Sequence, residues 1–181
     1  MKKTILLTAL LSVGSLCFAG RDIPLNFEKN LATAAADAIA PKNWHKNFAT
    51  VKNIGVSKID ATAKGKKFLN IKTTTQETPF YTPASYKVKP GEILEVEVEA
   101  SGKGTLLVGY YSYNKKGSWY STPNSIKKFA LTPDKKEYKA EFKLANVGKN
   151  ELAAVRIVFG AGNRTDVNVY DVDAEIENPK K

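Results

Sequence analysis

Three stretches of the sequence alternate strictly between apolar and charged residues, and this alternation limits the fold more than any other feature. They are 94–100 (LEVEVEA), 138–144 (YKAEFKL) and 170–176 (YDVDAEI). Side chains on a β-strand point alternately to opposite faces, so each stretch predicts a strand with one dry and one wet face. Further apolar runs at 106–113 and 155–159 add to this pattern. The sequence therefore predicts an all-β chain, an antiparallel β-sandwich of the jelly-roll type.

The N-terminal residues predict export. Two lysines precede an apolar run at 4–16, and the segment ends on a small residue, Ala19. This is the pattern of a bacterial signal peptide, and the run is too short to span a bilayer. We expect a secreted or periplasmic protein without a membrane span. Residues 1–19 are the predicted signal peptide, 20–177 a single jelly-roll domain and 178–181 a tail.

One segment departs from the strand pattern. Residues 28–40 (EKNLATAAADAIA) are rich in alanine and are followed by Pro41. Alanine favours helix and proline stops it, so we expect a short helix or a long loop over one end of the sandwich.

The amino-acid composition argues against several kinds of functional site. The chain has a formal net charge of +10, with one histidine and one cysteine, and that cysteine lies within the predicted signal peptide. This argues against a disulfide, a transition-metal site and cysteine–histidine catalysis. The lysines are spread over apparent turns and no nucleic-acid-binding motif is present, so an acidic envelope polymer or protein is favoured over nucleic acid as a charged partner.

The segment 106–120 (LLVGYYSYNKKGSWY) concentrates aromatic residues. On a strand, Gly109, Tyr111 and Tyr113 share one face, and the following turn brings Trp119 and Tyr120 alongside, so that one of these two shares that face. Trp119 is the candidate that we select. Exposed rings can stack on the C–H face of a sugar, and a strand glycine leaves backbone open to close approach. The alternative is that these rings pack against the N-terminal segment or a partner subunit.

Two aromatic residues outside this segment are further candidates for ligand contact. Trp44 follows the alanine-rich segment, and its alternative role is a structural plug of the core. Tyr81 lies in a stretch flanked by prolines that could form a wall of a cleft, or a turn whose rings pack onto the sheet.

The order of several motifs resembles carbohydrate-binding modules of families 4 and 9, which are galactose-binding-like jelly rolls. The motifs are Asn26-Phe27-Glu28, Trp44, 86–100 (YKVKPGEILEVEVEA), 129–132 (FALT) and 169–176 (VYDVDAEI). The resemblance implies a strand at Asn26-Phe27-Glu28 and an exported protein that binds sugar. It also implies a structural calcium ion, held by the positions that match Glu28 and Asp171 here.

Glu95, Glu97 and Glu99 raise the possibility of catalysis, because retaining glycosidases use two nearby carboxylates. Their alternation with valine is also what the wet side of any amphipathic strand shows. We therefore predict that the chain is not an enzyme and binds a polysaccharide or oligosaccharide by aromatic stacking on one sheet face. We expect no cofactor other than the structural calcium ion that the resemblance implies. The alternatives are a structural or adhesive cell-envelope protein that binds an acidic partner, and a glycoside hydrolase.

Overall fold

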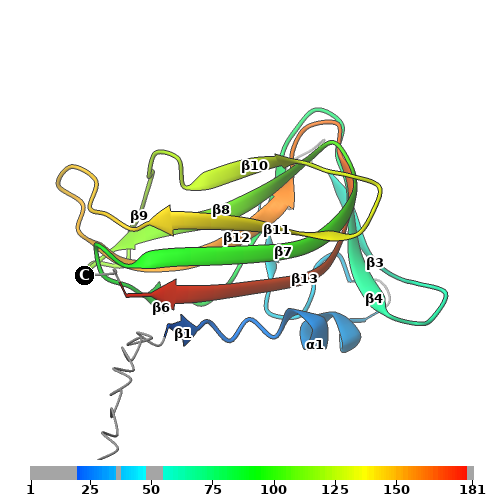
Figure 1. Cartoon of the computed structure of the whole chain (residues 1–181), viewed down its shortest axis with the longest axis horizontal. Helices are drawn as coiled ribbons and strands as arrows, with labels where there is room; N and C mark the ends of the chain where they lie inside the picture. The colour runs from blue at the N-terminus through cyan, green and yellow to red at the C-terminus, as the bar shows by residue number, and fades with distance from the viewer. Residues whose placement is uncertain (1–19, 36–37, 48–54, 179–181) are drawn as a thin grey trace, which may run out of the picture.

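The chain folds into two antiparallel β-sheets packed face to face, with one short helix beside them (Figure 1). The structure is a computed structural model and describes residues 20–35, 38–47 and 55–178. The predicted signal peptide and residues 179–181 of the predicted tail lie outside the described residues. The predicted all-β antiparallel sandwich is confirmed.

Sheet A has the strand order β11-β7-β13-β4-β3, with β1 added beside β13. Its strands are β1 (Arg21–Asp22), β3 (Val56–Ala61), β4 (Lys67–Lys72), β7 (Ile93–Lys103), β11 (Lys136–Lys143) and β13 (Asp166–Glu177).

Sheet B has the order β10-β8-β12-β5-β2, with β6 beside β12 and β9 beside β8. Its strands are β2 (His45–Lys46), β5 (Thr78–Tyr81), β6 (Tyr86–Lys87), β8 (Thr105–Asn114), β9 (Trp119–Tyr120), β10 (Ile126–Ala130) and β12 (Leu152–Ala161).

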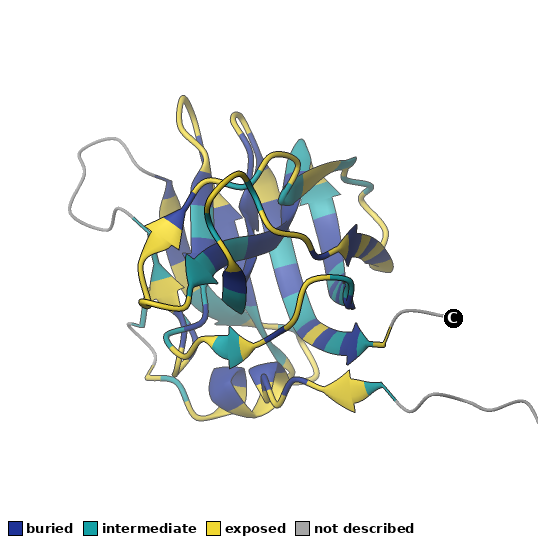
Figure 2. Ribbon diagram, turned by 90° about the vertical axis from the view of Figure 1, so that its left-hand side faces the viewer, coloured by how far each residue is buried: buried dark blue, intermediate teal, exposed yellow. Residues whose placement is uncertain are grey.

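The inner faces of the two sheets form the hydrophobic core. On β7, Leu94, Val96 and Val98 are fully buried, while the glutamates between them are partly exposed. Strands β11 and β13 show the same alternation, which is visible as changing colours along the strands in Figure 2. The apolar half of each predicted strand therefore drives the two sheets together.

The alanine-rich segment forms a shorter helix than its composition suggests. Helix α1 covers Phe27–Ala32 and buries Phe27 and Leu31, which lie one turn apart. A helix thus replaces the strand that the family resemblance implied at Asn26-Phe27-Glu28. Beyond Leu31 the sequence offers only alanine, threonine and aspartate up to Ile39, so a longer helix would bury little apolar surface. In the ranges that the structure describes, no helix has the length and hydrophobicity needed to cross a bilayer.

Four aromatic rings meet in the core beside α1. The ring of Phe159 on β12 lies 4.8 Å from Trp44, 5.4 Å from Phe27 and 5.4 Å from Phe80, measured between ring centres. Three of these residues are at most 2% exposed and Trp44 is 5% exposed. The cluster ties the N-terminal segment to sheet B.

Candidate functional site

The outer face of sheet B gathers aromatic side chains from four strands. Tyr111 and Tyr113 come from β8, Tyr81 from β5, Trp119 from β9 and His45 from β2. Trp119 stands directly opposite Tyr113, and His45 directly opposite Tyr81, in the strand pairing. We call these five residues, with Arg156 of β12, the aromatic strip.

The rings of the strip are close enough to form a continuous surface on its β2 side. His45 and Tyr81 are stacked, with ring centres 5.5 Å apart and planes 28° apart. Tyr81 and Tyr111 are 5.9 Å apart and tilted by 55°. Trp119 is 59% exposed and Tyr81, Tyr111 and Tyr113 are partly buried, so the strip is accessible from solvent.

Arg156 lies between Tyr81 and Tyr113 and contacts both rings. Its guanidinium carbon lies 5.6 Å from the centre of the Tyr81 ring and 4.8 Å from that of Tyr113. These are cation–π distances. Nε donates a hydrogen bond to the Ser85 hydroxyl at 3.2 Å. The remaining guanidinium N–H groups can meet ligand oxygens beside the rings.

Tyr111 is held by a hydrogen bond to its hydroxyl group. The Asn47 side-chain amide donates to its hydroxyl at 3.1 Å. Burial raises the pKa of the Tyr111 phenol above its ordinary value, so it remains a neutral hydrogen-bonding group. The arrangement offers flat apolar surface, a phenol and a guanidinium side by side, which suits a ligand with both C–H faces and hydroxyls.

The structure brings four of the predicted ligand-binding residues together: Tyr81, Tyr111, Tyr113 and Trp119. Sequence reasoning missed His45 and Arg156. Alternation along 152–161 places Arg156 on the wet side of its strand, but only the pairing of β12 with β8 and β5 sets it among the rings.

The structure contradicts the role predicted for Gly109. A methyl group at this position would lie 2.0 Å from the carbonyl oxygen of Ser125 and 2.9 Å from Cα of Ile126. Gly109 is buried, and the chain's own residues 125–126 make the close approach that was expected from a sugar. The glycine is required by strand β10 and offers no open backbone to a ligand.

The structure also contradicts Trp44 as a ligand contact. At 5% exposure, between Phe27 and Phe159, its ring belongs to the core. It is the structural plug that was the alternative interpretation.

Of the two predicted calcium ligands, Glu28 lies on helix α1 and Asp171 on strand β13 of sheet A. The Glu28 carboxylate is 2.6 Å from the ammonium of Lys66, so this lysine already neutralises the negative charge that a calcium ion would neutralise. Burial, and then the neighbouring Asp173, raise the pKa of Asp171 to about 6. Among the described residues no group of three or more His, Cys, Asp or Glu is arranged to hold a metal ion. In this arrangement Glu28 and Asp171 do not form a calcium site. Calcium binding, which would require Glu28 to leave Lys66, stays a prediction.

The glutamates of β7 are paired with lysines. Lys139 of β11 contacts both Glu95 and Glu97, the latter at 3.1 Å, and Lys135 lies 2.7 Å from Glu99. These contacts agree with the wet strand face that their alternation predicted.

No protein-family model matches the sequence, and no curated protein matches it. The fold itself is a jelly-roll-like β-sandwich that many solved structures share.

A cyclase from Fischerella sp. TAU matches with a TM-score of 0.65 and 10% identity, over 90% of this chain and 100% of that one. The enzymatically active domain of tailspike protein 4 from bacteriophage CBA120 gives a TM-score of 0.57 and 10% identity, over 83% of this chain and 21% of that one. The CBM22-1–GH10 modules of Clostridium thermocellum xylanase 10B, complexed with xylohexaose, give a TM-score of 0.53 and 10% identity, over 77% of this chain and 27% of that one.

The cyclase overturns the prediction that the chain is not an enzyme. Cyclases are enzymes, and the whole of this cyclase aligns with 90% of this chain. A sandwich of this size can therefore carry catalysis, and the wet-face explanation of the glutamates is no argument against it.

The xylanase match agrees with the coarser part of the family resemblance. It shows that the fold is one that carbohydrate-binding modules use, although the module named there belongs to family 22 instead of family 4 or 9.

Proposed function

We propose that this protein binds a polysaccharide or oligosaccharide on the outer face of sheet B. The observation that carries the proposal is the aromatic strip, in which Tyr81, Tyr111 and Tyr113 are partly exposed and Trp119 is 59% exposed. Each ring presents a flat apolar face, and Arg156 adds hydrogen-bond donors among them. The xylohexaose complex of the xylanase modules supports the proposal by showing the fold in a protein that holds a sugar chain.

Export is part of the proposal. The predicted signal peptide at 1–19 would deliver the domain to the periplasm or the medium, where polysaccharides occur. The narrower assignment to families 4 and 9 rests on motif order alone.

The test measures binding to a panel of soluble glycans, including xylan and xylohexaose, by calorimetry. Stacking on an aromatic ring contributes on the order of 1 kcal/mol, so Trp119→Ala and Tyr113→Ala should each weaken binding about five- to tenfold. Val56→Ala is the matched control, because it removes exposed apolar surface from sheet A.

Salt separates this proposal from an adhesive protein that binds an acidic partner. Stacking should survive an increase in ionic strength, whereas binding driven by the lysines should be lost. Binding that salt abolishes and that both variants retain would overturn the proposal. The same glycans are also assayed for the release of hydrolysis products, because enzymes share this fold.

A further inference from the structure

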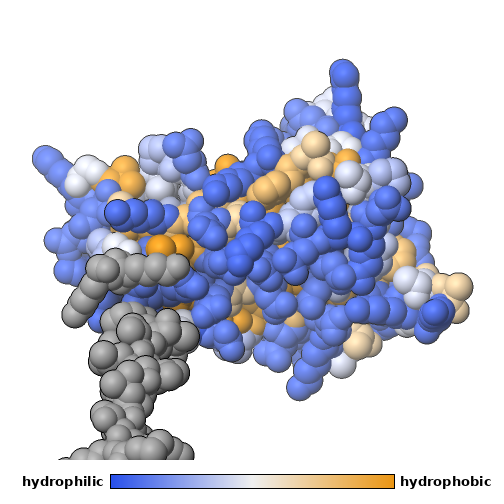
Figure 3. All heavy atoms as spheres, in the orientation of Figure 1, coloured by the Kyte–Doolittle hydropathy of each residue, from blue (hydrophilic) through white to orange (hydrophobic). Residues whose placement is uncertain are grey.

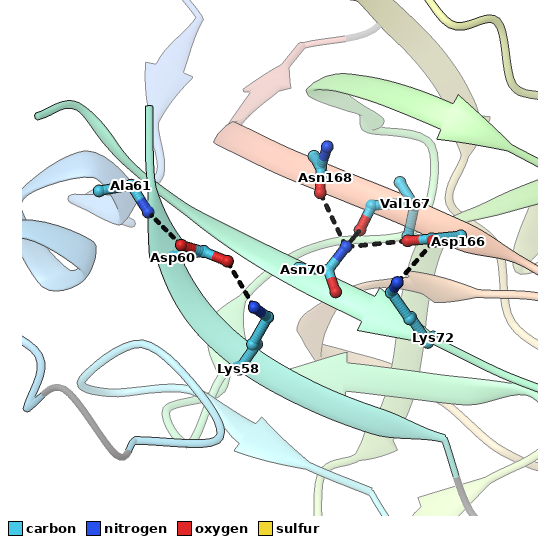
Figure 4. A network of polar contacts seen from close by, with 8 residues as sticks. All are labelled: Lys58, Asp60, Ala61, Asn70, Lys72, Asp166, Val167 and Asn168. Atoms are coloured by element: carbon cyan, nitrogen blue, oxygen red, sulfur yellow. Dashed lines mark hydrogen bonds and ion pairs between the residues drawn. The ribbon is translucent and has the colours of Figure 1, made fainter. Parts of the chain in front are cut away.

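The outer face of sheet A contains a hollow that the proposed function does not use. Its volume is about 500 Å³, within the range of ligand sites. It lies over β3, β4, β13 and the end of β7, and Figure 4 shows the polar network in it. The residues that matter here are Phe68, Asn70, Ser101, Lys103, Asp166 and Asn168.

The floor of the hollow is held in one arrangement by Asn70. Its side-chain amide donates to Asp166 at 2.9 Å and to Asn168 at 2.8 Å, bridging β4 and β13. Asn70 is only 8% exposed, whereas Asn168 is half-buried and Asp166 is exposed. The oxygens of the two outer side chains have further lone pairs to offer, which suits the hydroxyl groups of a sugar.

The rim of the hollow carries an excess of positive charge. Lys72 pairs with Asp166 at 3.0 Å and Lys58 with Asp60 at 2.5 Å. Lys103, also exposed, has no ion pair with any described residue. The hollow thus has three lysines against two aspartates, and an anionic group beside Lys103 would displace no existing partner.

One side of the hollow is apolar. Phe68 is half-buried and lies 5.5 Å from Tyr170, with the rings tilted by 49°. The Tyr170 hydroxyl is fixed by Ser101 at 3.0 Å. Phe68 therefore presents an aromatic wall beside the amide and carboxylate groups, a combination that simple anions do not need and sugars use.

We propose that this hollow is a second saccharide site, which takes a sugar bearing a carboxylate, a uronic acid. Lys103 meets the carboxylate, Asp166 and Asn168 accept hydrogen bonds from ring hydroxyls, and Phe68 covers a C–H face. The site lies on the sheet opposite the aromatic strip, so it goes beyond the proposed function and does not depend on it. With both sites filled, one molecule would bridge two glycan chains.

The test uses NMR titration of the side-chain amides of Asn70 and Asn168 with a trisaccharide of galacturonic acid, against its methyl ester, at one ionic strength. The acid should shift both amides. Lys103→Ala should weaken binding of the acid about tenfold, which corresponds to the loss of one charged hydrogen bond, and should leave binding of the ester unchanged. Lys149→Ala, an exposed lysine outside the hollow, is the matched control.

Three results would overturn this site. The first is that the acid does not shift the NMR signals of the two amides. The second is that Lys103→Ala and Lys149→Ala weaken binding of the acid equally. The third is that inorganic phosphate shifts the amide signals as strongly as the trisaccharide does. Trp119→Ala separates the two sites, because it should weaken only binding at the strip. Failure at one site therefore leaves the other standing.

Discussion

The two outer sheet faces are built from the same alternating pattern and have opposite chemistry. On sheet B the outward positions hold the aromatic strip. On sheet A, three pairs of carboxylates stand directly opposite each other on β7 and β13: Glu99 with Asp171, Glu97 with Asp173 and Glu95 with Glu175. The side of the molecule seen in Figures 1 and 3 is accordingly mostly hydrophilic.

Like charges directly opposite each other destabilise a sheet. Lys139 and Lys135 offset the charges on β7, but within the described residues the three opposing carboxylates of β13, Asp171, Asp173 and Glu175, have no ion pair. Sheet A therefore keeps its outer charges at some expense in stability, whereas the outer rings of sheet B pack on one another. The comparison teaches that alternation determines which side chains face out, and strand pairing determines what they meet.

The two tryptophans provide the largest test of this comparison. Trp44→Ala removes a ring from the core and should lower the free energy of unfolding by about 3 to 5 kcal/mol. Trp119→Ala removes a surface ring and should change it by about 0.5 kcal/mol or less. Urea denaturation measures both. A cost for Trp119→Ala as large as that for Trp44→Ala would show that the strip is packing and not a free surface.

Gly109→Ala tests whether residues 125–126, at the start of the neighbouring strand β10, approach β8 closely at this position. The new methyl group would collide with the Ser125 carbonyl, so we expect a loss of about 1 to 3 kcal/mol in the free energy of unfolding. Gly65→Ala is the control, because nothing lies within 4 Å and only its φ of +80° opposes alanine, at a cost of about 1 kcal/mol. Unchanged stability in Gly109→Ala would mean that the backbone there is open, as the sequence first indicated.

Asp171→Asn tests the repulsion on sheet A. The pKa of about 6 in the folded protein lies above the ordinary value of 3.8, so the folded state holds this proton more tightly than the unfolded state. This contribution to stability is present below about pH 4 and is lost as the pH rises through about 6.

At about pH 7.5 Asp171→Asn should therefore stabilise the protein by about 1 kcal/mol, a value reduced for screening by water, and at about pH 4 it should have little effect. Thermal unfolding at both pH values measures the difference. Asp134→Asn, in an exposed loop, is the control. An equal gain from the two variants, or a gain that persists at low pH, would contradict the prediction.

The strands could be predicted because burial follows a local pattern. Leu94, Val96 and Val98 are buried where alternation placed them, and the turn brings the segment 119–120 back beside Tyr113, where the strand register sets Trp119 on the same face. Such features depend on residues close together in the chain.

The rest of the candidate site depends on contacts between distant segments. His45 joins the strip only because β2 pairs with β5, and Arg156 only because β12 lies between β5 and β8. The prediction for Gly109 was wrong for the same reason, since nothing nearby in the sequence indicates that Ser125 lies beside it. Helix α1 replaced a predicted strand because Phe27 and Leu31 bury themselves one turn apart.

The last strand of the described residues, β13, occupies the middle of a sheet. Strand β13 pairs with β7 on one side and β4 on the other, and β1 is added to it. While the ribosome is still making residues 166–177, sheet A lacks the element that joins its halves, so the domain cannot complete its hydrophobic layer. Sheet A can therefore close only after residues 166–177 have been synthesised, which makes its completion a late step of folding.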